Sequence, residues 1–138
     1  MVLRLAAKDS EDLKVISAHM QDALVRLADI RYLAKSRQFA FVANRFAWEL
    51  QPKAERRRSG LHFEHVLSVK QHGIMAQAKD AILSLLAITF EPGPEPSGTV
   101  VLTFSANCTI RLEVEYLDLH LKDLGGAWAT HLTPHHGD

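Results

Sequence analysis

Apolar and polar residues alternate along much of this 138-residue chain, and this pattern limits the fold more than any other feature. Successive side chains of a β-strand point to opposite faces, so alternation predicts strands with one face on a core. A bend near Ala28 and Asp29 would keep two differently phased apolar sets on the same side. The alternating sets are Phe39, Phe41 and Ala43; Leu61, Phe63, His65, Leu67 and Val69; Val100, Leu102 and Phe104; and Ile110, Leu112, Val114 and Tyr116.

Helical spacing is found on either side of this region. Apolar residues at intervals of three or four predict an N-terminal helix over about 10–21, after the capping residue Asp9. The same spacing predicts a C-terminal helix over about 117–124, with Gly125 and Gly126 as its caps. Because few helices separate the strands, parallel β-α-β units are disfavoured.

The expected fold is α+β: a mainly antiparallel curled sheet or small barrel with an N-terminal helix and a C-terminal helix. The pleckstrin-homology-like split barrel is its nearest analogue, since a helix there plugs one open end. Residues 1–130 are expected to form a single globular domain, and 131–138 a frayed tail. Residues 50–60 hold a proline and no apolar period, which predicts a loop.

Features of the whole chain favour a reducing compartment. Cys108 is the only cysteine, so an internal disulfide is excluded. No apolar stretch approaches the ~20 residues that span a bilayer, and the start of the chain does not resemble a secretion signal. We therefore expect a soluble cytoplasmic protein that does not bind membranes.

Motifs for catalysis or for a cofactor are not visible in the sequence. His62 and His65 are three residues apart on a predicted strand, so they point to opposite faces and cannot share a metal ion. His65 shares the phase of Leu61 and Phe63, which predicts a core histidine. No metal, cofactor or catalytic residue is expected, and the question of an enzyme stays open with the balance against it.

The uneven distribution of charge along the chain is the one sequence feature that hints at a function. The formal net charge is zero, yet residues 26–70 carry +6 and residues 71–138 carry −5. Two explanations stay open: a surface for an acidic partner or a phosphate backbone, or pairing with acidic residues near the C-terminus. The candidate binding residues are Arg45, Lys53, Arg56, Arg57 and Arg58, and the acidic ones are Glu113, Glu115, Asp118 and Asp123.

Four segments resemble a family of small bacterial proteins, chiefly alphaproteobacterial, that is classed as a domain of unknown function. The likeness covers about 3–130, and it implies a free-standing, single-domain cytoplasmic protein without implying an activity. The segments are Asp29–Phe39, Arg56–Glu64, Pro96–Val100 and Leu121–Trp128.

Three functions compete on this basis. The first is a non-enzymatic protein-binding or adaptor domain, whose partner could be another protein or a second copy of the chain. The alternative is binding of nucleic acid or a phosphorylated ligand through the basic loop 53–58, although no exposed aromatic residues accompany these arginines. The third is a small-molecule enzyme that uses His62, Glu64 and His65.

Overall fold

The computed structural model describes residues 3–52 and 54–129, and of 125–129 only the backbone. One α-helix, α1 (Ser10–Met20), accompanies a ten-stranded sheet in these residues. Four short 3-10 helices, η1 (Leu27–Asp29), η2 (Ala34–Ser36), η3 (Trp48–Leu50) and η4 (Ile74–Ala76), join strands. The strands are β1 (Arg4–Ala7), β2 (Ala23–Arg26), β3 (Arg31–Leu33), β4 (Gln38–Phe46), β5 (Glu55–Phe63), β6 (Val66–His72), β7 (Ile82–Pro92), β8 (Gly98–Phe104), β9 (Thr109–Val114) and β10 (Leu119–Ala129).

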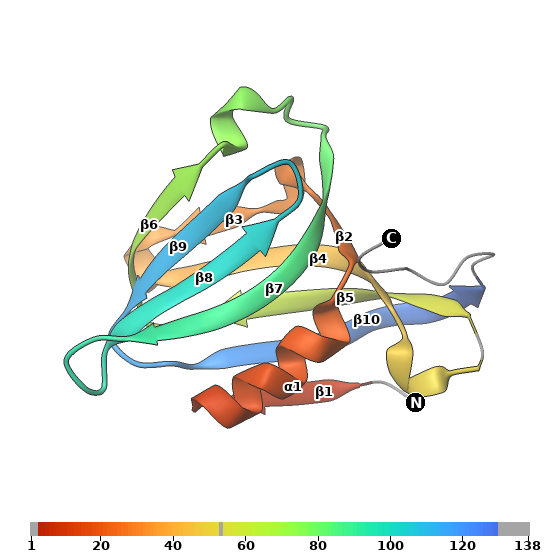
Figure 1. Cartoon of the computed structure of the whole chain (residues 1–138), viewed down its shortest axis with the longest axis horizontal. Helices are drawn as coiled ribbons and strands as arrows, with labels where there is room; N and C mark the ends of the chain where they lie inside the picture. Colours follow the sequence, from red (N-terminus) through yellow and green to blue (C-terminus); the bar gives the residue numbers. More distant parts are fainter. Residues whose placement is uncertain (1–2, 53, 130–138) are drawn as a thin grey trace.

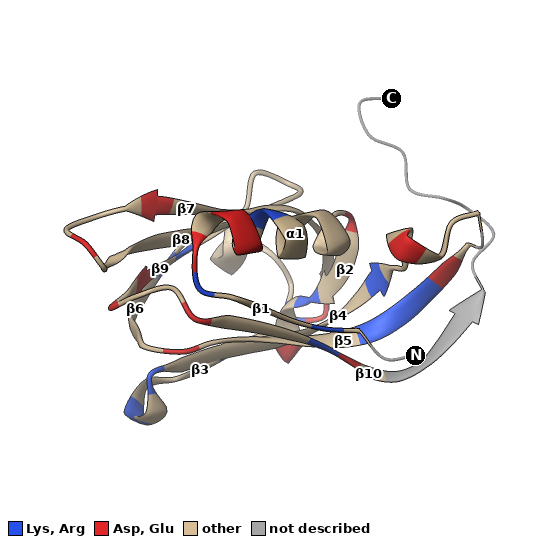
Figure 2. Ribbon diagram, turned by 90° about the horizontal axis from the view of Figure 1, so that it is seen from below, with Lys and Arg blue, Asp and Glu red and all other residues tan. Residues whose placement is uncertain are grey.

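The sheet is antiparallel, curled and unclosed. Its order is β1-β10-β5-β4-β2-β7-β8-β9-β6, and β3 pairs with β4 beside β2. The curl brings two layers face to face, one with β10, β5 and β4 and the other with β7, β8 and β9 (Figures 1 and 2). This confirms the expected antiparallel curled sheet.

Helix α1 covers one open side between the two layers. The Asp9 side chain caps it by accepting a hydrogen bond from the Asp12 amide at 2.8 Å, and Glu11 and Asp12 lie in its first turn. Its narrow apolar face, Leu13, Ile16 and Met20, is buried, and the helix packs on β7 and β1. The predicted N-terminal helix is therefore confirmed within one residue.

The core lies between the layers and is filled by most of the alternating residues, whereas Leu67 and Tyr116, which belong to the same predicted sets, are 50% and 40% exposed. Phe63 and Leu102, from opposite layers, are 1% and 0% exposed. Phe39 packs against Phe41 and Phe63, with ring centroids 6.3 and 6.1 Å apart. The bend predicted near Ala28 exists as η1, which separates β2 from β3.

The predicted C-terminal helix is wrong, because that segment is strand β10. Leu119 and Leu121 are buried while His120, Lys122 and Leu124 face outward, which is the period of a strand. The helical spacing of the leucines at 117, 121 and 124 coexists with this period of two, and pairing with β1 and β5 on either side decides between them. Gly125 and Gly126, expected as helix caps, lie at a register shift within β10. The pleckstrin-homology-like analogy depended on that helix and loses its basis.

Two further sequence predictions need correction. The predicted loop 50–60 contains the first half of β5, whose backbone pairs with β4 and β10 although its side chains are mostly charged. The continuous strand predicted over 61–70 is interrupted at His65. This residue adopts a left-handed conformation (φ 58°) between β5 and β6. His65 is partly exposed at this turn, so it is not a core histidine.

The tail predicted for 131–138 lies outside the described residues. Among the residues that the structure does describe, no helix has the length and apolar character needed to cross a membrane.

Replacing Leu102 with Ala should lower the free energy of unfolding by about 2–5 kcal/mol, because it leaves a cavity in a dry core. Leu86→Ala on β7 is the matched control, since Leu86 is 40% exposed and the change should stay within about 1 kcal/mol. Urea denaturation followed by tryptophan fluorescence measures both values. Equal effects of the two substitutions would contradict this assignment of the core.

Candidate functional site

The basic residues singled out in the sequence do not form one exposed surface. Arg45 is 0% exposed, Arg56 and Arg57 are partly buried on β5, and Arg58 is exposed. Lys53 lies outside the described residues. Figure 2 shows the basic stretch on β5, where Arg57 is directly opposite Arg45 on β4.

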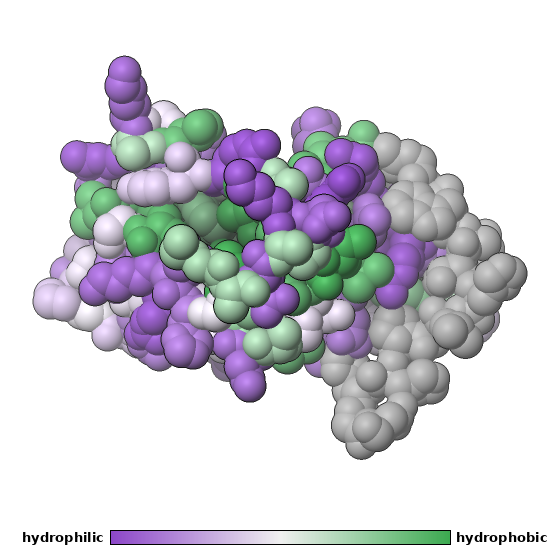
Figure 3. All heavy atoms as spheres, turned by 90° about the horizontal axis from the view of Figure 1, so that it is seen from above, coloured by the Kyte–Doolittle hydropathy of each residue, from purple (hydrophilic) through white to green (hydrophobic). Residues whose placement is uncertain are grey.

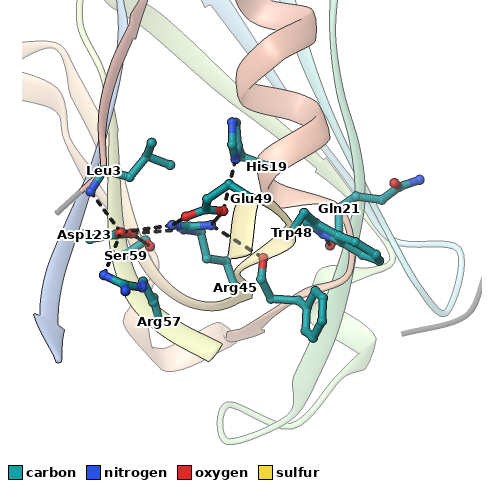
Figure 4. A network of polar contacts seen from close by, with 10 residues as sticks. Leu3, His19, Gln21, Arg45, Trp48, Glu49, Arg57, Ser59 and Asp123 are labelled. Carbon is teal, nitrogen blue, oxygen red and sulfur yellow. Dashed lines mark hydrogen bonds and ion pairs between the residues drawn. The ribbon is translucent and has the colours of Figure 1, made fainter. Parts of the chain in front are cut away.

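Arg45 is at the centre of a buried polar network (Figure 4). Its Nε and Nη2 donate to the two carboxylate oxygens of Asp123, each at 2.9 Å. Its Nη1 and Nη2 donate to Glu49 at 2.8 and 2.7 Å. Ser59 Oγ and the Leu3 amide donate to Asp123 at 2.6 and 3.1 Å. The network thereby ties β4, β5, β10 and η3 to the N-terminal segment.

Hydrogen bonding outweighs burial for both carboxylates. Burial by itself would raise the pKa of Asp123, but the bonds from Arg45, Ser59 and the Leu3 amide hold the pKa below its ordinary value of 3.8. The bonds from Arg45 are the main influence on Glu49 and lower its pKa below 4.5. Burial would lower the pKa of Arg45, yet the two carboxylates raise it. All three groups are therefore charged at neutral pH.

Sequence reasoning identified Arg45 but missed its role and most of its partners. A signal was present, because Arg45 continues the inward phase of Phe41 and Ala43. Ser59 likewise shares the phase of Leu61, and Asp123 that of Leu121. Polar residues at inward-facing positions of three strands indicate a buried polar network, since buried polar groups need hydrogen-bond partners.

Pairing between the basic region and the acidic C-terminal residues is only partial. Of the four acidic residues considered, Asp123 meets Arg45, and it is 3.9 Å from Arg57. Glu115 pairs with Arg37, which lies in the basic stretch 26–70 but is not one of the candidate binding residues. Glu113 accepts from the Thr99 hydroxyl, and Asp118 contacts His120 at 2.8 Å and His65 at 3.6 Å.

A second polar cluster lies on the outer face of β5 and β10. His62 and His120 are cross-strand neighbours whose rings stack at 4.8 Å, and each contacts a carboxylate, Glu64 at 2.7 Å and Asp118 at 2.8 Å. Burial alone would raise the pKa of Glu64, but bonds from Gln38 and His62 lower it. No group of three or more metal-binding side chains in the described part of the chain could hold an ion.

The cluster offers little to a substrate. His62 borders a hollow of about 430 Å³ with Lys122 and Leu124, but Glu64 and His65 do not line it. Glu64 is already engaged by Gln38 and His62. His65 contacts the Tyr116 hydroxyl at 2.6 Å, and its Nε2 is 3.6 Å from Asp118, the carboxylate that His120 also contacts.

The sheet fails to close along a seam between β3 and β6. Strand β6 ends the sheet order, and no other described strand pairs with its second edge. Two contacts hold one end of the seam: Tyr32 Oη donates to the Val66 carbonyl at 3.1 Å, and the Val66 amide donates to the Arg37 carbonyl at 2.8 Å. No backbone hydrogen bond from another described strand reaches 67–72 except those from β9.

Apolar side chains are exposed along this seam. Met75 on η4 is 86% exposed, and Leu33 on β3 and Leu67 on β6 are about half exposed, at 49% and 50%. At the other end of the seam, Leu27, Ile74 and Met75 line a hollow of about 550 Å³. Figure 3 faces the side on which η4 lies and shows apolar residues in a depression between hydrophilic ones.

Sequence comparison places the chain in a family over almost its full length. Residues 3–136 match the family described as "Protein of unknown function (DUF2948)". The chain belongs to the DUF2948 family. No curated protein and no solved structure matches it. This confirms the resemblance to a domain of unknown function, and the family's description assigns no site, so the geometry alone must indicate one.

Substituting Asn for Asp123 should lower the free energy of unfolding by about 3–5 kcal/mol, because it leaves the Arg45 guanidinium under-compensated in the interior. Glu11→Gln is the control: its ion pair with Lys14 is exposed and contributes at most about 1 kcal/mol. Denaturant titrations at neutral pH measure both changes. A loss below about 1 kcal/mol for Asp123→Asn would show that the network does not support the fold.

Stability should also fall in acid through the same network. The folded pKa values of Asp123 and Glu49 lie below the unfolded ones, so the stability they contribute is complete above about pH 4.5 and is lost as pH falls through the folded values. Between about pH 4.5 and 2, the wild type should therefore lose more stability than the double variant Asp123→Asn/Glu49→Gln. Parallel slopes for the two proteins would contradict this.

Proposed function

We propose that this protein is a protein-binding module that captures an extended segment of a partner along the seam between β3 and β6. The observation that carries the proposal is the second edge of β6, which no described strand covers and beside which apolar side chains are exposed. An uncovered strand edge presents backbone donors and acceptors that an added strand can satisfy. Binding here would extend the curled sheet.

Binding energy would come from two sources. Main-chain hydrogen bonds to β6 give affinity that depends little on the partner's sequence. Side chains on one face of the added strand can then enter the hollow beside Met75, where burying one large apolar side chain contributes roughly 1.5–3 kcal/mol. These two sources of binding energy fit an adaptor that binds with moderate affinity and catalyses no reaction.

Binding of nucleic acid or a phosphorylated ligand through 53–58 has less support. Arg58 is the exposed arginine of that segment, and the hollow that it borders with Arg26 also holds Asp29 and Asp80. Acidic residues there would repel phosphate. An enzyme built on His62 and Glu64 is weaker still, because these two groups already bind each other.

Selection from a random peptide library displayed on phage tests the proposal. Enriched peptides should slow amide hydrogen exchange in β6 and η4, because an added strand hydrogen-bonds the outer edge of β6. Met75→Asp should weaken their binding by about 10- to 100-fold, the equivalent of losing one buried apolar contact. Val15→Asp, at an exposed apolar site on α1 (50% exposed), should bind like the wild type.

Protection elsewhere, or equal loss in both variants, would contradict strand capture at the seam. Failure to enrich any peptide from a library that selects normally against a known strand-binding domain would also count against it.

A further inference from the structure

We infer that the segment captured at the seam is acidic and apolar in alternation, and that it belongs to a different protein rather than to a second copy of this chain. This rests on the proposed function and adds the chemistry of the partner. This inference is based on the positive charge of the residues on either side of the seam.

The hollow combines apolar residues with cations. Leu27, Ile74 and Met75 line it together with Arg31 and Lys79, and no described lining residue is acidic. The Arg31 guanidinium is oriented by the carbonyls of Ala28 and Ile30, the second at 3.0 Å. A ligand that fills this hollow therefore meets apolar surface and positive charge at once.

The same sign continues along the strands that border the seam. Neither β3 (RYL) nor β6 (VLSVKQH) contains an acidic residue. Lys70 on β6 and Lys79 are both exposed. Neither lysine has a carboxylate within ion-pair distance among the described residues.

Three nearby acidic groups have a cationic partner of their own. Glu115 pairs with Arg37, Asp29 lies 3.7 Å from Arg26, and Glu91 pairs with Arg111. Glu113, opposite Ser68, accepts from the Thr99 hydroxyl, and Asp80 lines the separate hollow that holds Arg26 and Arg58. The cations of the seam are thus available to a partner, and opposite charges placed across a new strand pair stabilise it.

A second copy of the chain fits this edge poorly. Pairing β6 with β6 about a two-fold axis near the middle of its uncovered part would place Lys70 of one copy near Lys70 of the other, without an acidic residue on either strand. Like charges opposite one another destabilise strand pairing. An acidic partner strand has the reverse effect, with its carboxylates beside Lys70 and Lys79 and its apolar residues in the hollow.

The test uses the whole chain and three synthetic eight-residue peptides with Val and Leu at the same alternate positions and Glu, Thr or Lys between them. We expect the Glu peptide to bind about tenfold more tightly than the Thr peptide at low ionic strength, and the Lys peptide to bind most weakly. The advantage of the Glu peptide should shrink in 0.5 M salt, because salt screens exposed charges. Fluorescence anisotropy measures the affinities.

A charge swap then assigns the effect to the seam. In the double variant Lys70→Glu/Lys79→Glu the order should reverse, so that the Lys peptide binds most tightly. Lys122→Glu, on the exposed face of β10, is the matched control and should keep the wild-type order. Because all three lysines are exposed, thermal unfolding should show that every variant folds.

The outcomes separate the two proposals. Equal binding of the Glu and Thr peptides, with β6 protected, would overturn the acidic partner and leave strand capture intact. A concentration-dependent dimer that protects β6 without peptide would assign the edge to a second copy and overturn the inference. If no peptide of any charge binds and none is enriched from the library, strand capture fails and the inference with it.

Discussion

A buried guanidinium–carboxylate pair joins parts of the chain that are far apart in the sequence. Arg45 and Asp123 are 78 residues apart, and their contact binds β4 to the C-terminal strand across β5. Glu49 and Ser59 complete the set of hydrogen bonds. A buried charge is tolerated only when it is fully partnered. The layer of β10, β5 and β4 therefore depends on these contacts, and the charged half of β5 can pair as a strand beside them.

The rest of the sheet curls away from this layer and does not return to it. Strand β6 contacts η2 and η4, but β3 pairs with β4 and not with β6. The fold thus combines a tightly fixed layer with an edge that described strands leave uncovered. This contrast is why the proposed binding function falls on the seam, where backbone groups and apolar side chains are accessible, and not on the more conspicuous arginines.

The candidate site shows where sequence reasoning stops. The basic excess over 26–70 is real, but burial divides it: Arg45 is a structural centre, whereas Lys70 and Arg31 border the seam. The net charge of a segment does not show which of its side chains are buried. The position of a residue in the alternation along its strand does show this, and Arg45, Ser59 and Asp123 could have been identified as inward-facing in this way. The seam had no such signal, since an uncovered edge is a property of strand order.

The sequence by itself determined the antiparallel sheet, the capped helix α1, the bend at η1 and most residues of the core, although His65, Leu67 and Tyr116 of the inward-facing sets are exposed in part. Each of these follows from the period of side chains or from capping contacts between near neighbours. Only the tertiary structure decided that residues 119–129 form a strand, that the charged residues 55–58 belong to the sheet, and that β6 ends it. The physical reason is that hydrogen bonds and ion pairs between distant segments, such as Arg45 with Asp123, can override local preferences that are worth little per residue.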